Sequence, residues 1–536
     1  MTSPDMTFDS FAGQFRWQIP DRYNIARDTC DRWAETEPDR PAIIDWSSGR
    51  RREFTYSALR MMADGLANRL LEAGIGKGDR VGVGLSQSAF TAAAHISIWK
   101  TGAISLPLSP QFGDDALHFR LADSGARAVI TDLEGSKGLA SISDRLPALE
   151  LVLLPGSRSN ASYGTTVEAA DTAADDPALL MYTSGTTGPA KGVLHAHRVL
   201  LGHLPGVEIS HDLFPQPGDV IWTPADWSWI GGLLDVLMPG LHHGVPVVAS
   251  RFPKFSPDRA KELIEGERIR CVFFPPTALR MLRAHRCSID GLRTVACGGE
   301  PLGAEMLDWG RGAFGVKINE FYGQTECNMV VSSCGALSAH RPGWTGRPVP
   351  GHEVAVIDRS GRQIQDMEGD IAIRKGTPVM MLRYWNRPDA AAEKFRGDWM
   401  LTGDRGVAAD GFIRFVGRND EVITSAGYRI GPAEIEDCLL THDSVASAGV
   451  VGKPDPVRTE IVKAYIVLRE NVAADGDMER SIQDHVRQRL ARYAFPREVE
   501  FVDELPMTVT GKVMRAVLRE RARAETRETR RSSEVH

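Results

Sequence analysis

The 536-residue sequence has no long run of apolar residues. None approaches the roughly 20 residues that a helix needs to cross a bilayer, so we expect no membrane span. The first 18 residues mix Asp, Ser and Phe, without the positively charged segment and following apolar segment of a secretory signal. These two absences favour a cytoplasmic protein.

Cysteine is scarce, and no sign of charge dominates. The seven cysteines are odd in number and scattered, without the spacing of a zinc site or of a disulfide framework. Reduced thiols are therefore expected, which fits the cytoplasm. The net charge of −7 and the absence of a broad basic stripe argue against a nucleic-acid-binding protein.

Apolar patterns indicate the fold class. A chain of this length predicts roughly two to four structural units. Amphipathic helix patterns such as 56–73 alternate with short apolar strand patterns such as 80–85, which is typical of mostly parallel sheets covered by helices. Segments 370–374 and 411–415 alternate apolar with polar or small residues, which indicates half-exposed antiparallel strands. A compact α+β unit follows residue 420, and an Arg/Glu-rich tail from about residue 518 is expected to be a frayed helix or disordered.

A loop rich in Gly, Ser and Thr follows the apolar segment 178–181. Residues 182–192 read YTSGTTGPAKG, which places several backbone N–H groups and hydroxyls around one concavity, with a lysine at its edge. Such loops bind phosphate oxygens, although the spacing is not that of a Walker loop. A flexible linker is the alternative interpretation. The predicted phosphate contacts are Thr183, Ser184, Gly185, Thr186, Thr187 and Lys191.

This loop resembles the phosphate loop of the adenylate-forming (AMP-binding) superfamily, which contains acyl-CoA synthetases, peptide-synthetase adenylation domains and luciferases. Members usually have Pro where Ala190 stands. Five further motifs occur in the family's order, so the resemblance covers nearly the whole chain. It implies an α/β fold with a large N-terminal domain (1–419) of packed, mostly parallel β-sheets with helices and a distorted β-barrel. A small, mobile α+β C-terminal domain (420–518) and a charged tail (519–536) would follow.

Three of these motifs are similar to nucleotide-binding segments of the family. Residues 319–326 (NEFYGQTE), which we expect to follow a short strand at 315–318, imply that Thr325 contacts the α-phosphate, Glu326 binds Mg²⁺ and Tyr322 stacks on adenine. Segment 298–302 resembles the adenine-side loop, and Asp404, expected at a strand end, would take both ribose hydroxyls. Taken singly, each motif would be read as an ordinary turn. The remaining residues assigned to ATP or AMP from these segments are Gly299, Glu300, Pro301, Glu320, Phe321 and Gly323.

Two motifs concern the C-terminal domain. Segments 417–421 and 425–432 resemble the family's hinge and the loop after it, with Arg418 at ribose or phosphate, Asp420 as the pivot and Arg429 at the α-phosphate. Segment 506–512 resembles the loop of the catalytic lysine, so Lys512 would stabilise charge during adenylation and could be switched off by a protein lysine acetyltransferase. The channel for the CoA thiol would be formed by Ser425, Ala426 and Gly427, although many CoA-using members have Ser where Ala426 stands.

The resemblance thus implies an ATP-dependent acid–thiol ligase that uses Mg²⁺ and coenzyme A. The implied acid is medium-chain, branched or aromatic, because Gly323 replaces the Trp of acetate-specific relatives and segment 225–232 resembles the gate of medium-chain acyl-CoA synthetases. The alternatives are an adenylation enzyme that loads a carrier protein, for which Asp226 is poorly placed, and a non-catalytic relative. A monomer and a dimer both stay open. The expected acyl pocket is formed by Trp227, Trp229, Gly232 and Gly323.

Three histidines close together, His195, His197 and His203, suggest a metal site at first sight. No two of them are four residues apart, so they would not lie on one face of a helix as paired ligands. We expect them to be surface residues or residues at the N-terminus of a helix.

Overall fold

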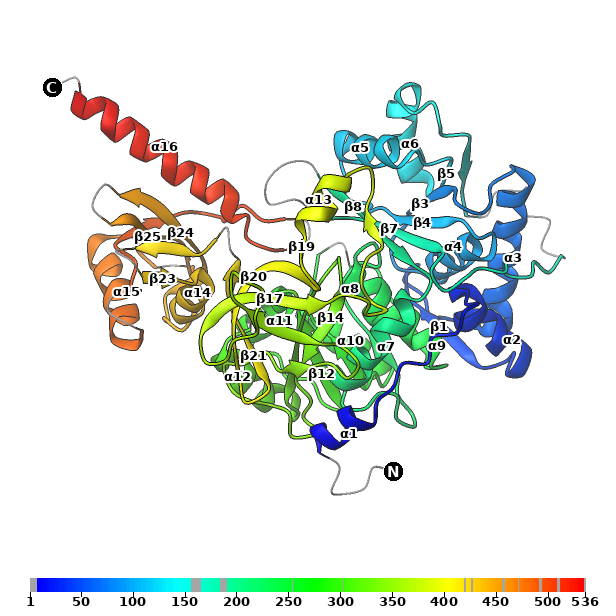
Figure 1. Cartoon of the computed structure of the whole chain (residues 1–536), viewed down its shortest axis with the longest axis horizontal. Helices are drawn as coiled ribbons and strands as arrows, with labels where there is room; N and C mark the ends of the chain where they lie inside the picture. Colours follow the sequence, from blue (N-terminus) through cyan, green and yellow to red (C-terminus); the bar gives the residue numbers. More distant parts are fainter. Residues whose placement is uncertain are drawn as a thin grey trace.

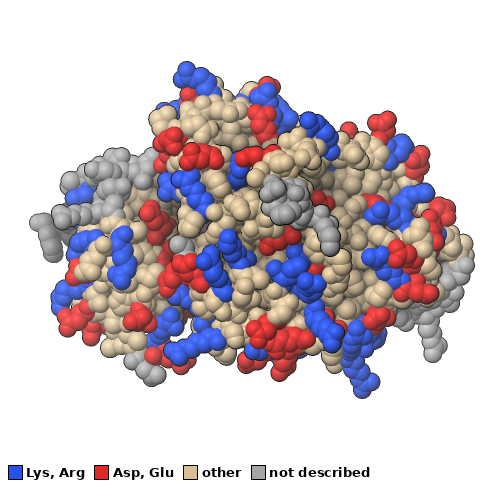
Figure 2. Space-filling view, turned by 90° about the horizontal axis from the view of Figure 1, so that it is seen from below, with Lys and Arg blue, Asp and Glu red and all other residues tan. Residues whose placement is uncertain are grey.

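The computed structural model describes residues 7–155, 165–183, 190–252, 254–300, 302–418, 421–425, 428–455, 458–470, 472–490, 494–508 and 511–534. A large body holds the chain up to β21, and a smaller body at one end holds the C-terminal part (Figure 1). Among the described residues, no helix is long and apolar enough to span a membrane. On the face shown in Figure 2, acidic and basic side chains are interspersed rather than gathered by sign.

A nine-stranded sheet forms the centre of the large body. Its order is β15-β14-β13-β12-β11-β9-β10-β1-β2, and the five pairings from β13 to β1 are parallel. The edge pairings, β13–β14, β14–β15 and β1–β2, are antiparallel. The strand bounds are β1 Pro41–Asp45, β2 Arg52–Thr55, β9 Ile221–Trp222, β10 Val247–Ala249, β11 Cys271–Phe273, β12 Thr294–Gly298, β13 Ile318–Gln324, β14 Asn328–Ser332 and β15 Arg347–Pro348.

A second sheet of seven strands has the order β18-β8-β7-β4-β3-β5-β6. The run from β7 to β6 is parallel, and β8 returns antiparallel to β7. The two parallel sheets confirm the α/β class that the alternating patterns predict. The bounds are β3 Arg80–Gly84, β4 Ile104–Pro107, β5 Ala128–Thr131, β6 Leu151–Leu153, β7 Pro177–Thr183, β8 Lys191–Ala196 and β18 Arg383–Tyr384.

Helices cover these sheets, and local sequence fixes several of their starts. Thr55, for example, caps α3 by accepting a hydrogen bond from the backbone N–H of Ala58 at 3.2 Å. The apolar stripe of α3 then packs in the main core with α4 and β3. The helices of the large body are α1 Phe8–Gln14, α2 Arg32–Thr36, α3 Tyr56–Glu72, α4 Ala89–Lys100, α5 Asp114–Ser124, α6 Leu133–Ile142, α7 Val199–Ser210, α8 Ile230–Gly232, α9 Met238–His242, α10 Pro257–Gly266, α11 Pro276–Ala284, α12 Ala304–Phe314 and α13 Pro388–Glu393. Shorter turns are η1 Arg27–Asp31, η2 Ser143–Arg145 and η4 Leu233–Leu237.

The strands expected in a distorted barrel pair as a five-stranded antiparallel sheet. The order is β16-β17-β20-β19, with β21 also on β20. The antiparallel pairing is confirmed, but β17 is not half-exposed: its five central residues are buried on both faces. The bounds are β16 Val354–Ile357, β17 Glu368–Arg374, β19 Phe395–Arg396, β20 Trp399–Ala409 and β21 Phe412–Arg418.

The smaller body is an α+β unit, as predicted. Its sheet has the order β23-β22-β25-β24, with β26 parallel to β25. The predicted frayed tail is wrong in its first turns, because α16 is a continuous helix whose Leu518 and Ala522 are buried against β24 and β25. The bounds are β22 Ile423–Ser425, β23 Tyr428–Ile430, β24 Val445–Asp455, β25 Thr459–Leu468, β26 Glu498–Phe501, α14 Pro432–Leu440, α15 Gly476–Arg489 and α16 Arg515–Glu534.

Candidate active site

Several of the residues predicted to hold the nucleotide lie at or near the carboxyl ends of parallel strands. In open α/β sheets, ligands bind at this edge. Thr183 ends β7 and pairs with Lys191 at the start of β8, and its Oγ1 donates to the Lys191 carbonyl at 3.4 Å. Residues 184–189, and with them the predicted contacts Ser184, Gly185, Thr186 and Thr187, lie outside the described residues.

Most of the motif at 319–326 forms a strand, rather than the turn that follows a strand. β13 begins at Ile318, so the expected strand at 315–318 is wrong: the strand starts where that segment ends. Thr325 and Glu326 lie in the tight turn between β13 and β14. The Oη of Tyr384 donates to Glu326 Oε1 at 2.6 Å, and Lys394 Nζ lies 3.9 Å from the same oxygen. No sequence motif predicts either of these contacts of Glu326.

His195 supports this turn from the neighbouring sheet. Its Nε2 lies 2.7 Å from the Thr325 carbonyl oxygen, which only accepts, so Nε2 carries the proton. Burial lowers the pKa of His195 to about 4, which keeps the ring neutral. The expectation of surface or helix N-terminal residues is therefore wrong for His195, which lies in β8, whereas His197 and His203 do lie just before and early in α7. All three, His195, His197 and His203, are fully buried, each with its own hydrogen-bond partner.

The carboxylate of Asp404 accepts hydrogen bonds from two residues of the motif at 319–326. The Tyr322 hydroxyl donates to Asp404 Oδ2 at 2.6 Å, and Gln324 Nε2 donates to the same oxygen at 2.7 Å. Asp404 lies in the middle of β20 rather than at a strand end, and it pairs across the ladder with Arg418. Burial raises the pKa of Asp404, while the Tyr322 hydrogen bond and the charge of Arg418 oppose the rise. The structure thus joins three predicted nucleotide residues into one cluster.

The segment 298–302 depends on close backbone approach. A Cβ at Gly298 would lie 2.3 Å from the Phe321 ring, and Gly299 has φ +101°, so glycine is required at both positions. Glu300 forms an ion pair with Arg280 at 3.1 Å. Pro301 lies outside the described residues.

Glu320 is partly buried beside this segment. It accepts a hydrogen bond from the Leu302 N–H at 3.1 Å, and burial raises its pKa to about 7. The neighbouring Phe321 packs on Phe273, with ring centroids 5.2 Å apart. Both side chains are therefore held below the 298–302 segment, and neither is an open contact surface.

Lys512 reaches the large body from the far end of the chain. Thr277 Oγ1 donates to the Gly511 carbonyl at 3.1 Å, which attaches the lysine loop to the start of α11. The loop is closed on itself, since the Thr508 N–H donates to the Lys512 carbonyl at 2.7 Å. Lys512 Nζ then lies 3.8 Å from the point where a Cβ on Gly299 would stand. A cation is therefore placed at the end of β12.

Several C-terminal predictions fall outside the described residues. These are the pivot Asp420, the channel residues Ala426 and Gly427, and the side chain of Arg429. The backbone of Arg429 pairs with Thr424 across β22 and β23. Ser425 is described and is 2% exposed, paired with Tyr428 and Thr459.

The expected acyl-pocket residues do not all face open space. Trp227 is fully buried in the main apolar cluster, while Trp229 is only partly buried and meets Phe112 edge-on, with centroids 6.0 Å apart. A Cβ at Gly323 would lie 1.6 Å from the Asn328 carbonyl oxygen, and one at Gly232 would lie 2.4 Å from the Asp226 oxygen. These two glycines allow neighbouring backbone segments to approach closely and do not enlarge a pocket. The prediction that Gly323 deepens the acyl pocket is therefore not supported.

The carboxylate predicted to bind magnesium is that of Glu326. Within the described part of the chain, no group of three or more His, Cys, Asp or Glu side chains is arranged to hold a metal. Mg²⁺ is usually bound through one or two carboxylates together with substrate phosphates and water. Glu326, 12% exposed at the turn after β13, fits that mode of binding.

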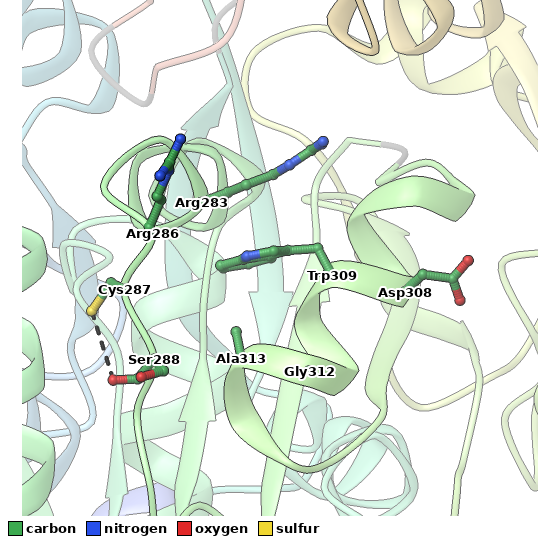
Figure 3. Close-up of a pocket in the computed structure, with 8 residues that line it drawn as sticks. All are labelled: Arg283, Arg286, Cys287, Ser288, Asp308, Trp309, Gly312 and Ala313. Carbon is green, nitrogen blue, oxygen red and sulfur yellow. Dashed lines mark hydrogen bonds between the residues drawn. The ribbon is translucent and has the colours of Figure 1, made fainter. Parts of the chain in front are cut away.

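A surface hollow of about 550 Å³ lies elsewhere, between α11 and α12 (Figure 3). Figure 3 shows Trp309 across its middle, with Arg283 and Arg286 above it and the Asp308 carboxylate pointing away. None of its lining residues belongs to the predicted motifs. We therefore place the candidate site at the strand ends and not in this hollow.

Comparison with known proteins identifies the family. The model of the AMP-binding enzyme family matches residues 30–385, and that of the AMP-binding enzyme C-terminal domain matches residues 434–512. The chain belongs to the AMP-binding enzyme family. The predicted resemblance is confirmed, and with it the expectation of a ligase.

Relatives of this AMP-binding enzyme match along its whole length. The acetyl-coenzyme A synthetase of Bacillus subtilis (strain 168) is 34% identical over 93% of this chain and 90% of its own. The mitochondrial acyl-coenzyme A synthetase ACSM3 of Mus musculus is 32% identical over 96% and 93%. The crystal structure of the anthranilate CoA ligase AuaEII with anthranoyl-AMP has a TM-score of 0.87 at 28% identity, covering 96% of this chain and 99% of that one.

Proposed function

We propose that this AMP-binding enzyme is an acyl-CoA synthetase that activates a carboxylic acid through an acyl-adenylate and then forms the CoA thioester. In the first step a carboxylate oxygen attacks the α-phosphorus of ATP, and pyrophosphate leaves. In the second step the CoA sulfur attacks the acyl carbon, AMP leaves, and the thiol proton passes to solvent. Full-length similarity to named acyl-coenzyme A synthetases supports this assignment.

The position of Lys512 is the observation that carries the proposal. Its ammonium lies beside Gly299, at the edge where β12 and β13 end, although more than 200 residues separate the two in sequence. A fixed cation at that edge stabilises the negative charge that develops while carboxylate and α-phosphate join. This arrangement corresponds to the adenylation step.

The nucleotide would be held by groups from four segments. Asp404 would take the ribose hydroxyls, with Tyr322 and Arg418 beside it, while Thr183, Lys191 and Thr325 would face the phosphates. Glu326 would hold Mg²⁺, which neutralises triphosphate charge when bound. His195 acts through the Thr325 carbonyl as a positioning residue.

Thioester formation requires a second arrangement of the domains. Lys512 and the channel segment 425–427 belong to different parts of the small domain, and each must act on the same acyl carbon. We infer that the small domain rotates about Asp420 between the two steps, which brings Gly427 to the site as Lys512 leaves.

The acid is proposed to be larger than acetate. Trp229 and Gly231 are half-buried residues of segment 225–232, and Phe112 from another part of the chain meets Trp229 edge-on. The bound anthranoyl-AMP of one structural neighbour shows that this fold accommodates an aromatic acyl group in that protein. A medium-chain, branched or aromatic acid is therefore favoured.

The test is ATP–pyrophosphate exchange over short-chain, medium-chain and aromatic acids, repeated with CoA to detect thioester. We expect acid-dependent exchange, with thioester and AMP formed in equal amounts when CoA is added. Exchange without thioester would favour carrier-protein loading instead. No exchange with any acid would contradict the proposal.

A further inference from the structure

A buried carboxyl, that of Asp235, lies in the same segment as the acyl-pocket residues. It belongs to η4, a π-helical turn between α8 and α9, and it is 2% exposed. Its neighbours on the turn, from Leu233 to Leu237, are part of the main apolar cluster. A carboxyl in such surroundings is unfavourable unless its oxygens are hydrogen-bonded, and π-helical turns occur frequently at functional sites.

Among the described residues, only one oxygen of Asp235 has a hydrogen-bond partner. Asn328 Nδ2 donates to Oδ1 at 2.6 Å, whereas no described residue donates a hydrogen bond to Oδ2. The next polar group, His203 Nε2, is 4.0 Å from Oδ1, which is too long for a hydrogen bond. His203 uses its Nδ1 proton on the Val199 carbonyl at 2.7 Å, so its Nε2 has no proton to offer. Oδ2 thus has no donor among the described residues, on a side chain that is 3% exposed.

Gly231 leaves the space beside this oxygen free of a side chain. A Cβ at Gly231 would stand 3.5 Å from Asp235 Oδ2 and 3.0 Å from the Phe273 ring, so any side chain there would cover the oxygen. Gly231 itself is half-buried and lies two residues from Trp229, which borders the proposed acyl pocket. Oδ2 therefore lies on the Gly231 side of η4, next to the segment that carries Trp229.

We propose that Asp235 is a specificity-determining residue and that the acid of this enzyme carries a hydroxyl group at its distal end, bound by Oδ2. The inference rests on the proposed acyl-adenylate chemistry. Burial raises the pKa of Asp235 well above its usual range. A hydroxyl suits either protonation state, because it donates to a carboxylate and accepts from a carboxylic acid. A methyl group in the same place would leave the buried oxygen unpaired.

Asp235 has a second role that the test must separate. Through Asn328, which has φ +41°, its Oδ1 holds the end of the turn that carries Thr325 and Glu326. Loss of this contact would slow adenylation of every acid alike. The ratio of rates for two acids of equal size reports on Oδ2 alone, because the turn affects both.

The first experiment measures kcat/KM of ATP–pyrophosphate exchange for matched acids: 3- and 4-hydroxybenzoate against the corresponding methylbenzoates, and 6-hydroxyhexanoate against heptanoate. We expect at least one hydroxyl acid to exceed its methyl partner by about tenfold or more. Methyl acids that equal or exceed their partners in every pair would overturn the inference. Since that result still requires exchange, it differs from failure of the proposed function, in which no acid reacts.

The second experiment compares Asp235→Leu with Asn328→Gly on the preferred pair. Asp235→Leu should abolish the hydroxyl preference, lowering the ratio to about one or less. Asn328→Gly, which keeps the backbone conformation, should lower both rates together and leave the ratio within about threefold. Thermal unfolding checks that the Asp235→Leu enzyme is folded. If the folded variant keeps the hydroxyl preference, the inference is contradicted.

Discussion

At the scale of single residues, the site depends on side chains that hold other side chains. Asp404 receives the Tyr322 hydroxyl and the Gln324 amide on one oxygen, and His195 fixes the Thr325 carbonyl. Tyr322, Thr325 and Asp404 are visible in the sequence as motif members. Gln324 lies inside a motif without an assigned role, and the expectation of an exposed His195 is wrong because strand β8 buries it.

Replacing Lys512 with Ala should lower the rate of pyrophosphate exchange by about 10²–10³-fold, since it removes a fixed cation from the developing charge. Acetylation of Lys512 by a lysine acetyltransferase should have the same effect. With preformed acyl-adenylate supplied, thioester formation should fall far less. Lys254→Ala, at an exposed lysine, is the control. Full exchange activity in a stoichiometrically acetylated sample would refute the role of Lys512.

Gly323→Ala should destabilise the protein without changing acid selectivity. The added Cβ would overlap the Asn328 carbonyl oxygen at 1.6 Å, so β13 and β14 must separate, at a cost of about 1–3 kcal/mol. Thermal unfolding measures this loss. Gly312→Ala is the matched control, because nothing lies within 4 Å of a Cβ there and alanine favours the helix. A shift of preference toward acetate at unchanged stability would restore the pocket interpretation.

At the scale of elements, α16 shows how charge patterning misleads. Its Arg- and Glu-rich sequence suggests solvent on all sides, yet Leu518 and Ala522 form a narrow apolar stripe against β24 and β25. Glu525 then reaches Lys463, which is 1% exposed, with Nζ 2.6 Å from Oε2. A predicted boundary at 518/519 therefore falls inside a packed helix.

Truncation after residue 518 should strongly destabilise the small domain, because it exposes Tyr465 and Val451 and removes a carboxylate from the buried Lys463. Truncation after residue 527 keeps Leu518, Ala522 and Glu525 and should be close to neutral. Limited proteolysis and thermal unfolding of the two truncated forms provide the comparison. Equal stability of both forms would mean that α16 contributes nothing beyond residue 518.

At the scale of the whole molecule, the two bodies meet through charged groups as well as through Lys512. Asp437 of α14 lies against Gly303, with its Cγ 3.0 Å from the Cβ position there. Burial raises the pKa of Asp437 to about 7; Arg280 opposes the rise, Glu436 and Glu300 add to it, and Arg515 opposes it. Ion pairs of Arg280 with Glu300 and of Arg515 with Glu436 complete this interface cluster.

Domain closure should therefore weaken as pH rises toward 7. A carboxyl whose pKa is raised in the closed form binds its proton more tightly there, so closure is favoured at low pH and loses that contribution between Asp's ordinary pKa and about 7. The equilibrium constant for domain closure should fall by up to about tenfold per pH unit in this window and level off above it. Fluorescence energy transfer between the two bodies from pH 5.5 to 8 measures it.

Asp437→Asn supplies the control for this prediction, because its side chain keeps the shape but carries no titrating proton. Its closing equilibrium should be nearly independent of pH over the same range. A variant with the same slope as the wild-type chain would assign the pH dependence to another group, such as Glu320, whose pKa is also raised to about 7.

The sequence by itself determined the α/β class, the order of the motifs and the residue types of the predicted nucleotide site, because strand periodicity and loop chemistry are local properties. Tertiary structure alone decided which of these residues meet: Lys512 with Gly299, His195 with Thr325, and Asp235 with Asn328. Tertiary structure also changed the interpretation of Gly323, because the missing side chain allows close approach of β14 rather than a deeper pocket. The physical reason is that burial and close approach are set by segments far apart in the chain, which no local pattern encodes.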